Sequence, residues 1–319
     1  MGEHGGAVVA PFWLCPGQGA QRVGMGKDLA DRFPAARETF QAIDDALGVA
    51  LSHLMFEGPE DELTATHNAQ PAILAHTAAV LAVVGPAAGA AAGAAGHSLG
   101  EYSAYVAAGA LSAAEAAKLV RRRGELMYKA SEERPGTMAA VLGLATAQVE
   151  AACNEASQQG SVVVAANLNA ADQTVISGDL EAVTRASAAC KARGAKRVAL
   201  LKVGGAFHSP LMAPAAQRLL LTLERAPFQD PAFPVIANAN AEAVKDAGRA
   251  RRLLVDQLTA PVRWVECMQH AARLAGEQGR FVEVGPGTVL AGLLKRIVPG
   301  ANVVSLAAAD EVTQFLEAA

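Results

Sequence analysis

A serine flanked by two glycines is the residue in this sequence best placed to do chemistry. Residues 96–100 read Gly-His-Ser-Leu-Gly, the Gly-x-Ser-x-Gly pattern that puts a serine on a tight turn between a strand and a helix. Glycine at positions 96 and 100 lets neighbouring backbone approach this turn closely. The positive end of the helix then lies where negative charge develops on an attacked carbonyl. The pattern predicts Ser98 as a nucleophile; the alternative is a serine that only caps a helix.

A nucleophilic serine needs a base, and His208 is the best candidate among the seven histidines. It lies in a Gly-rich loop after a predicted strand, where loops gather at the head of a sheet. The acids between Ser98 and His208, such as Asp172 and Asp179, fall in other units of the chain. We therefore expect a Ser-His dyad whose histidine is oriented by a group other than a carboxylate, such as a backbone carbonyl. The alternative is a loop histidine that bonds only the local backbone.

Arg123 is predicted to be buried and to need an anion. At about 100° per residue, Leu119 and Met127 lie within about 60° of it on the apolar face of their helix, whereas Arg121 and Arg122 point away. A buried guanidinium keeps its charge and must be paired. Since no acid lies nearby on the same helix face, a bound ligand is favoured over an internal carboxylate.

Composition excludes several classes of protein. The chain has 319 residues, 52% of them hydrophobic and 18% charged, and a net charge of −4, which indicates a globular protein and argues against nucleic-acid binding. The four cysteines lack C-x-x-C spacing, so we expect reduced, buried thiols and no metal site. No apolar run of about 18 residues and no secretory signal are present in the sequence, which predicts no membrane association. We expect a cytoplasmic protein, or an organellar one after removal of a transit peptide.

The elements that must position these residues form an α/β fold in two units. Alternating strands and helices predict a mainly parallel sheet in a main domain, residues 1–133 and 205–319, with the active face at the strand ends. Residues 134–204 follow a β-α-β-β-α-β order, typical of an inserted ferredoxin-like domain. Strands are expected at 7–14, before 96, and at 137–142, 162–168, 173–177, 196–203, 235–237, 280–284 and 302–306. Helices are expected at 25–47, 70–84, 102–108, 112–131, 146–158, 180–193, 210–225, 250–258, 264–275 and from 287 to 297.

Six motifs, in order along nearly the whole chain, resemble the malonyl-CoA:acyl carrier protein transacylase family. The acyltransferase domains of polyketide synthases are similar. The motifs are GQGAQ at 17–21, GHSLGEYS at 96–103, RG at 123–124, FHSPLM at 207–212, PVRW at 261–264 and EVGPG at 283–287.

The resemblance implies an α/β-hydrolase-like main domain and a ping-pong reaction. Ser98 would take the malonyl group from malonyl-CoA as an ester and pass it to the phosphopantetheine thiol of acyl carrier protein, with His208 as base and then acid. By similarity, Gln18 and the backbone N–H of Leu99 form the oxyanion hole. The backbone carbonyl of Arg263 would hold the His208 ring. The family often has glutamine at the position of Arg263, which a main-chain role tolerates.

The same resemblance assigns the substrate pocket. Arg123 matches the arginine that grips the malonyl carboxylate through paired hydrogen bonds. Gln70 and Met127 resemble residues that line the pocket. Phe207, before the histidine, resembles the malonyl-selective form, in which a bulky ring leaves little room for a branched α-carbon. We therefore expect malonyl to be preferred over methylmalonyl.

The expected partners are coenzyme A thioester and acyl carrier protein, with no metal and no cofactor besides the substrate, and a monomer is expected. An acidic carrier calls for a basic docking patch. The candidates are Lys191, Arg193, Lys196, Arg197 and, separately, Lys295 and Arg296. Three alternatives stay open: a serine esterase or thioesterase, which has no use for a buried arginine; a trans-acting polyketide-synthase acyltransferase; and a non-catalytic scaffold.

Overall fold

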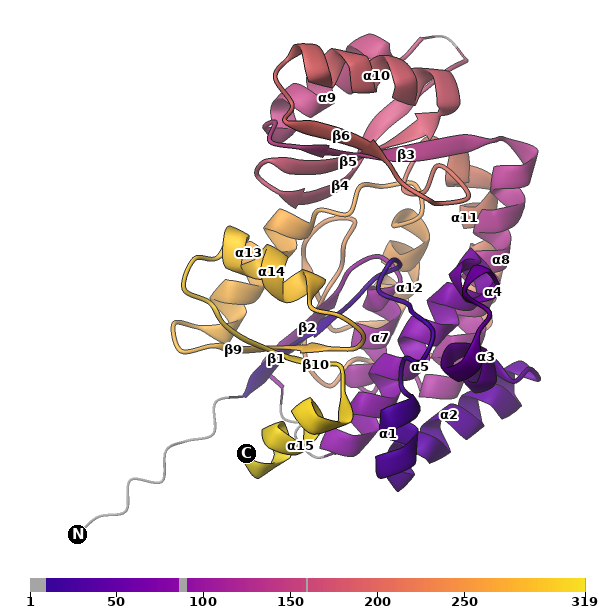
Figure 1. Ribbon diagram of the computed structural model, residues 1–319, viewed down its shortest axis with the longest axis vertical. Coiled ribbons are helices and arrows are strands. Elements are labelled where there is room, and N and C mark those ends of the chain that lie inside the picture. The colour runs from indigo at the N-terminus through magenta and orange to yellow at the C-terminus, as the bar shows by residue number, and fades with distance from the viewer. Residues whose placement is uncertain (1–9, 86–90, 159, 319) are drawn as a thin grey trace.

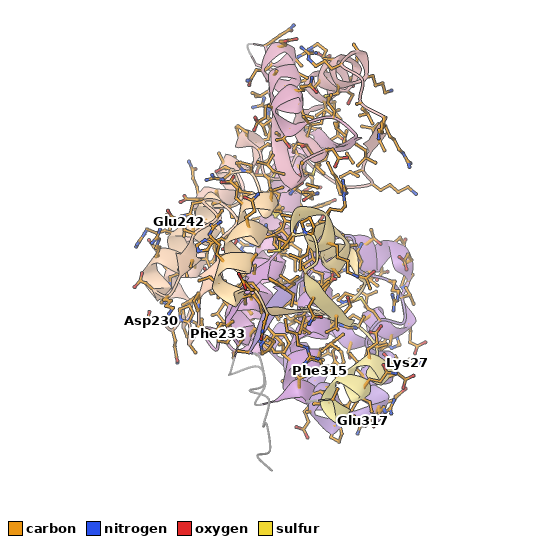
Figure 2. The ribbon with its side chains drawn as sticks, turned by 90° about the vertical axis from the view of Figure 1, so that its left-hand side faces the viewer. Lys27, Asp230, Phe233, Glu242, Phe315 and Glu317 are labelled. Carbon is orange, nitrogen blue, oxygen red and sulfur yellow. The ribbon has the colours of Figure 1, made fainter. Side chains whose placement is uncertain are left out.

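The fold has two lobes, each built around its own sheet. The computed structural model describes residues 10–85, 91–158 and 160–318. The middle of the chain forms the smaller lobe, which lies at one end of the larger lobe (Figures 1 and 2). The start of the strand predicted at 7–14 lies outside the described residues, as does the N-terminal segment in which no secretory signal is expected.

The main sheet is mainly parallel, as predicted. Its strand order is β10-β9-β1-β2-β7-β8, and only the last pair is antiparallel. The strands are β1 (Pro11–Cys15), β2 (Gly93–Gly96), β7 (Val235–Ile236), β8 (Ala243–Val244), β9 (Arg280–Val284) and β10 (Asn302–Leu306). Five parallel strands place their carboxyl ends at one edge of the sheet, where functional loops gather.

Both faces of this sheet are covered by helices, which explains why its central strands β1 and β2 carry no charged side chain. In β1, Trp13 and Cys15 enter the larger core, whereas Phe12 and Leu14 enter a second core on the opposite face. The second core contains residues of α13 (Trp264–Ala275) and α14 (Val289–Ile297). The larger core contains residues of α1 (Lys27–Arg32), α2 (Pro34–Leu47), α3 (Leu51–Glu57), α4 (Glu60–Thr64), α5 (Thr66–Val84), α7 (Gly100–Ala107), α8 (Ala113–Glu133), α11 (Ala213–Arg225), α12 (Ala247–Asp256) and α15 (Ala309–Glu317).

Some predicted helix bounds were wrong, and prolines lie at two of these places. The single helix expected at 25–47 is two helices, because Phe33 precedes a proline and takes an extended conformation. The helix expected to open at Gln70 begins at Thr66, with Pro71 in its second turn. Four short elements were not predicted: α3, α4, β8 and α15. Among the described residues, no helix is both long and apolar enough to span a bilayer.

The smaller lobe follows the predicted element order. An antiparallel sheet, β4-β5-β3-β6, packs against two helices around a separate core. The elements are β3 (Gly136–Leu142), α9 (Thr146–Ala156), β4 (Val163–Ala170), β5 (Gln173–Asp179), α10 (Leu180–Ala192) and β6 (Arg197–Leu200). Backbone hydrogen bonds from Leu168 N–H to the Val262 carbonyl, 2.9 Å, and from Val262 N–H to the Ala166 carbonyl, 2.8 Å, join the lobes.

Candidate active site

The turn that carries Ser98 is strained and held in place by an asparagine. Ser98 has a φ of 52°, a left-handed conformation that is uncommon for serine. A Cβ on Gly96 would lie 1.9 Å from the backbone of Gly100, so only glycine permits this turn. The Ser98 N–H donates to Asn238 Oδ1 at 2.7 Å, and Asn238 Nδ2 donates to the Gly96 carbonyl at 2.8 Å. These two bonds clamp the nucleophile's backbone at the end of β2.

Ser98 and His208 lie within hydrogen-bond distance. Ser98 Oγ is 2.7 Å from His208 Nε2, and His208 Nδ1 donates to the backbone carbonyl of Gln257 at 2.8 Å. This carbonyl leaves Nε2 free to accept the serine proton. Burial and the nearby charge of Arg123 lower the pKa of His208 to about 3, so the ring is neutral at physiological pH and its Nε2 carries no proton.

The prediction that Arg263 supplies this carbonyl was wrong. The Arg263 carbonyl is used inside helix α13, where it accepts from Cys267 N–H at 2.9 Å. The side chain of Arg263 pairs with Glu266. Gln257 directly follows α12, and its carbonyl is therefore available to the histidine. The expected kind of contact, a backbone carbonyl in place of a carboxylate, is present, but it comes from a different residue.

Arg123 is 1% exposed and points at the nucleophile. Its Nη1 donates to Gln70 Oε1 at 2.8 Å, and its Nη2 donates to Gln257 Oε1 at 3.0 Å and to Ser98 Oγ at 3.1 Å. Within residues 10–85, 91–158 and 160–318 its Nε–H is buried without a partner, and no carboxylate forms an ion pair with it. A buried cation with a spare donor is arranged to receive an anion.

A cavity of about 570 Å³ opens onto the dyad between the two lobes. Among the residues that line it are Gln18, Met127 and Phe207, together with Ser98, Arg123 and His208. Gln70, Leu99 and Arg263 are not among the residues that line it.

The other predicted site residues are placed by their contacts with neighbouring side chains and helices. Gln70 is fully buried and donates to Met127 Sδ at 3.5 Å, so its oxygen is turned toward Arg123. Gln18 Nε2 donates to Thr66 Oγ1 at 3.3 Å. Leu99 is the N-cap residue of α7. The backbone N–H groups at the start of a helix have no acceptor within the helix, so the Leu99 N–H can donate to another group.

Three residues of the site were missed by the sequence reasoning: Gln257, Asn238 and Glu101. Gln257 Nε2 donates to the Ser98 carbonyl at 3.0 Å and to Glu101 Oε2 at 2.7 Å. Asn238 could have been found, because it lies two residues after the buried strand β7, at the active edge of the sheet. Gln257 follows an amphipathic helix and carries no local signal.

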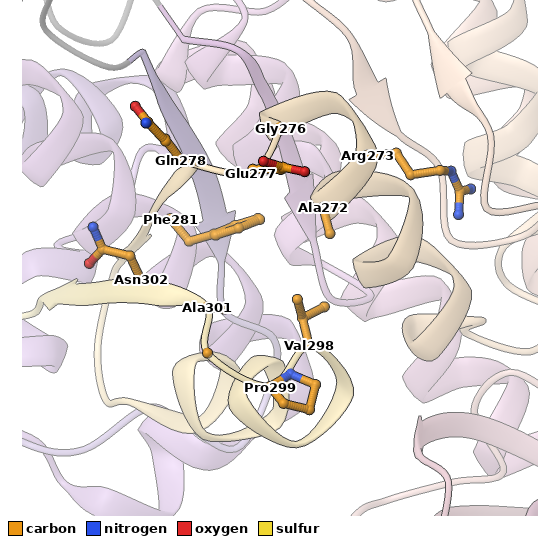
Figure 3. Close-up of a pocket in the computed structure, with 12 residues that line it drawn as sticks. Ala272, Arg273, Gly276, Glu277, Gln278, Phe281, Val298, Pro299, Ala301 and Asn302 are labelled. Carbon is orange, nitrogen blue, oxygen red and sulfur yellow. The ribbon is translucent and has the colours of Figure 1, made fainter.

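A larger cavity, about 720 Å³, lies away from this chemistry. It sits where β9 and β10 begin, at the edge of the parallel sheet opposite to Ser98, and is lined by Phe281, Val298, Gln278 and Asn302 among others (Figure 3). Among the described residues, no three His, Cys, Asp or Glu side chains are grouped so as to hold a metal ion.

Comparison with known proteins places the chain in a family. The acyl transferase domain family matches residues 12–311. The malonyl CoA-acyl carrier protein transacylase of Bacillus subtilis (strain 168) is 42% identical over 89% of this chain and 89% of that protein. The transacylase of the same name from Escherichia coli (strain K12) is 43% identical over 90% of this chain and 92% of that protein.

A solved structure agrees with these relatives. It is described as a type II PKS acyl-carrier protein in complex with its malonyl-transacylase, with a TM-score of 0.92 and 41% identity over 97% of this chain and 100% of the matched chain. The chain therefore belongs to the malonyl-CoA:acyl carrier protein transacylase family and is an acyltransferase.

Proposed function

We propose that this enzyme moves a malonyl group from malonyl-CoA to the phosphopantetheine thiol of an acyl carrier protein through an ester on Ser98. The observation that carries the proposal is Arg123, a buried guanidinium whose Nη2 lies 3.1 Å from Ser98 Oγ and whose Nε–H has no partner among the described residues. An esterase of neutral acyl groups gains nothing from burying such a cation. A thioester ending in a carboxylate does, because paired N–H bonds can hold that carboxylate while the carbonyl meets Ser98.

The first half-reaction uses the dyad as follows. His208 Nε2 takes the proton of Ser98 Oγ as the oxygen forms a bond to the thioester carbonyl carbon. The carbonyl oxygen becomes an oxyanion, which the N–H of Leu99 and Gln18 stabilise in this proposal. The carbon–sulfur bond then breaks, and the sulfur of coenzyme A leaves as a thiol with the proton from His208.

The second half-reaction reverses these roles. His208 removes the proton of the carrier's thiol, the sulfur attacks the Ser98 ester, and the serine oxygen regains a proton as it leaves. The Gln257 carbonyl holds the imidazole during both steps, since its bond to Nδ1 at 2.8 Å keeps Nε2 facing the serine. No cofactor or metal takes part in this scheme.

An acidic carrier partner fits a basic surface whose charges are not already paired within the protein. Of the six predicted docking residues, Arg193 and Arg296 form ion pairs with Glu155 and Asp172. Lys191, Lys196, Arg197 and Lys295 have no ion-pair partner among the described residues. The first three lie on the smaller lobe, and the loop after β6 of that lobe reaches the cavity through Lys202. We assign the carrier to this face of the smaller lobe.

We also propose that residues 134–204 are an inserted ferredoxin-like subdomain within an α/β-hydrolase-like catalytic domain, 1–133 and 205–319. The separate sheet and the separate core of the smaller lobe support this division. The bacterial origin of the relatives supports a cytoplasmic location, and we propose a monomer.

Transfer is distinguished from hydrolysis by following both products. The enzyme is incubated with malonyl-CoA with and without acyl carrier protein, and free malonate and malonylated carrier are measured. We expect rapid carrier loading and little malonate. Fast malonate release without the carrier would assign the protein as a thioesterase instead.

A further inference from the structure

Glu101 is a buried carboxylate that the proposed mechanism does not use. It lies one helical turn after Ser98 in α7 and is 0% exposed. Its Oε2 accepts from Gln257 Nε2 at 2.7 Å and from Asn238 N–H at 2.9 Å, and its Oε1 is buried with no partner among the described residues. Burying a carboxylate that has no cation bonded to it is costly, so a structural benefit or a functional one must offset that cost.

The contacts of Gln257 show what the carboxylate provides. An amide has an accepting oxygen at one side and two N–H donors at the other. Here the oxygen faces Arg123 Nη2 at 3.0 Å, and the nitrogen faces Glu101 and the Ser98 carbonyl. Exchanging the two ends would point N–H groups at the guanidinium and an oxygen at the carboxylate. Glu101, Arg123 and the Ser98 carbonyl therefore favour the same orientation of this amide, and Glu101 makes the shortest of the three bonds, 2.7 Å.

We propose that Glu101 is a positioning residue of the dyad that acts through Gln257. By holding the Gln257 side chain, it keeps the Gln257 backbone carbonyl on His208 Nδ1 and the Gln257 amide oxygen on Arg123. In a Ser-His-Asp triad the carboxylate orients the histidine directly. In this protein a carboxylate orients it through one intervening glutamine. The inference rests on the dyad of the proposed function and adds a residue that never touches substrate.

The surroundings of Glu101 make its charge state variable near neutral pH. Burial raises the pKa of Glu101 to about 7, although the bonds from Asn238 and Gln257 and the charge of Arg123 oppose this. The other titratable groups facing the carboxylate are Tyr102 and Tyr105 of its own helix and Cys267 of α13, all neutral in this range because burial raises the pKa of each. Loss of a proton from Glu101 strengthens its bond to Gln257, since an ionised acceptor binds N–H more tightly.

The test measures Ser98 reactivity with a fluorophosphonate, a general serine reagent that needs neither malonyl-CoA nor a carrier. Labelling rates are compared for the wild type, Glu101→Ala, Glu101→Gln, Gln257→Leu and the Glu101→Ala/Gln257→Leu double variant. The matched control is Glu283→Gln. Glu283 is also fully buried and also accepts two N–H bonds, from Leu290 and Ala291, but it has no hydrogen bond to the dyad.

We expect Glu101→Ala to slow labelling by about tenfold to a hundredfold, because small misplacements of reacting groups have effects of this size. Glu101→Gln, which keeps an acceptor, should recover most of that loss. If Glu101 acts through Gln257, the double variant should be no slower than the slower single variant. Glu283→Gln should label at the wild-type rate even where its thermal stability falls.

The pH profile separates positioning from a general loss of stability. The wild-type labelling rate should rise by about threefold to tenfold between about pH 6 and about pH 8, and Glu101→Gln should remove this rise. Equal labelling of wild type and Glu101→Ala, additive losses in the double variant, or an unaltered pH profile in Glu101→Gln would each overturn the inference. A wild type that is labelled at Ser98 but does not transfer malonyl would overturn the proposed function and leave this inference standing.

Discussion

Replacing Arg123 by alanine should change which acyl group the enzyme accepts. The guanidinium is buried, 3.1 Å from Ser98 Oγ, and keeps an unpartnered Nε–H. A carboxylate held by two charge-assisted hydrogen bonds gains about 1.5–3 kcal/mol from each, about 3–6 kcal/mol in all. This corresponds to a loss of about a hundredfold to ten-thousandfold in kcat/KM for malonyl-CoA. Acetyl-CoA lacks the carboxylate and should lose far less, or gain.

The assay is the rate of Ser98 acylation with malonyl-CoA and with acetyl-CoA, and the quantity that decides is the ratio of the two kcat/KM values. The substitution also leaves the amide oxygens of Gln70 and Gln257 without their donor, so the free energy of unfolding must be measured alongside. Arg123→Met, which keeps more of the volume, is a companion variant. Arg122→Ala is the matched control, because Arg122 is exposed and pairs with Glu125 at the surface. Equal losses for both substrates, or an unchanged malonyl rate, would refute the role given to Arg123.

Three further predictions follow from the same geometry. Phe207→Ala should raise the rate with methylmalonyl-CoA relative to malonyl-CoA by about tenfold, because the ring lines the cavity and one methyl group is worth about this factor; an unchanged ratio in a competition assay would contradict it. Asn238→Ala removes both side-chain hydrogen bonds that hold the turn at Ser98 and should slow acylation by about tenfold to a hundredfold in a burst experiment. A burst rate equal to that of the wild type would contradict this role of Asn238. Burial raises the pKa of Glu101 from 4.5 to about 7, so between these values the unfolded chain has released a proton that the folded protein keeps. The contribution of Glu101 to the free energy of unfolding therefore falls by about 3 kcal/mol as pH rises from about 4.5 to about 7. Urea unfolding should show that the stability of Glu101→Gln increases relative to wild type across this window. A stability difference that stays constant with pH would exclude the raised pKa.

The residues of the site that local patterns reveal are those whose chemistry depends on their own segment. Ser98 is marked by its flanking glycines, and Arg123 by a helical period that places a charge on an apolar face. His208 is marked by a Gly-rich loop after a strand. Each of these positions could be argued from fewer than about a dozen neighbouring residues, since helix and turn geometry are local.

The residues that escaped prediction act only through the tertiary fold. Gln257 contacts Ser98, Glu101, Arg123 and His208, which are distant in sequence, and nothing beside it in the chain distinguishes it from a solvated glutamine. The motif at 261–264 drew attention to Arg263, but the carbonyl that binds the histidine comes from the end of the preceding helix.

The fold itself was predictable where strands and helices are long and regular, as in α13, β9 and β10, whose observed and expected bounds coincide. The break at Pro34 could have been read from the sequence, because the residue before a proline avoids helical geometry. The short helices α3 and α4 could not, since fewer than about two turns give too little periodicity and their stability comes from packing.

The central claim is that Ser98 carries the malonyl group. Mass spectrometry of the intact protein after brief exposure to malonyl-CoA tests it directly. We expect a mass increase of one malonyl group on the wild type, mapped to Ser98, absent in Ser98→Ala and discharged by acyl carrier protein. A wild type that transfers malonyl without ever acquiring this adduct, or an adduct that persists in Ser98→Ala, would contradict it.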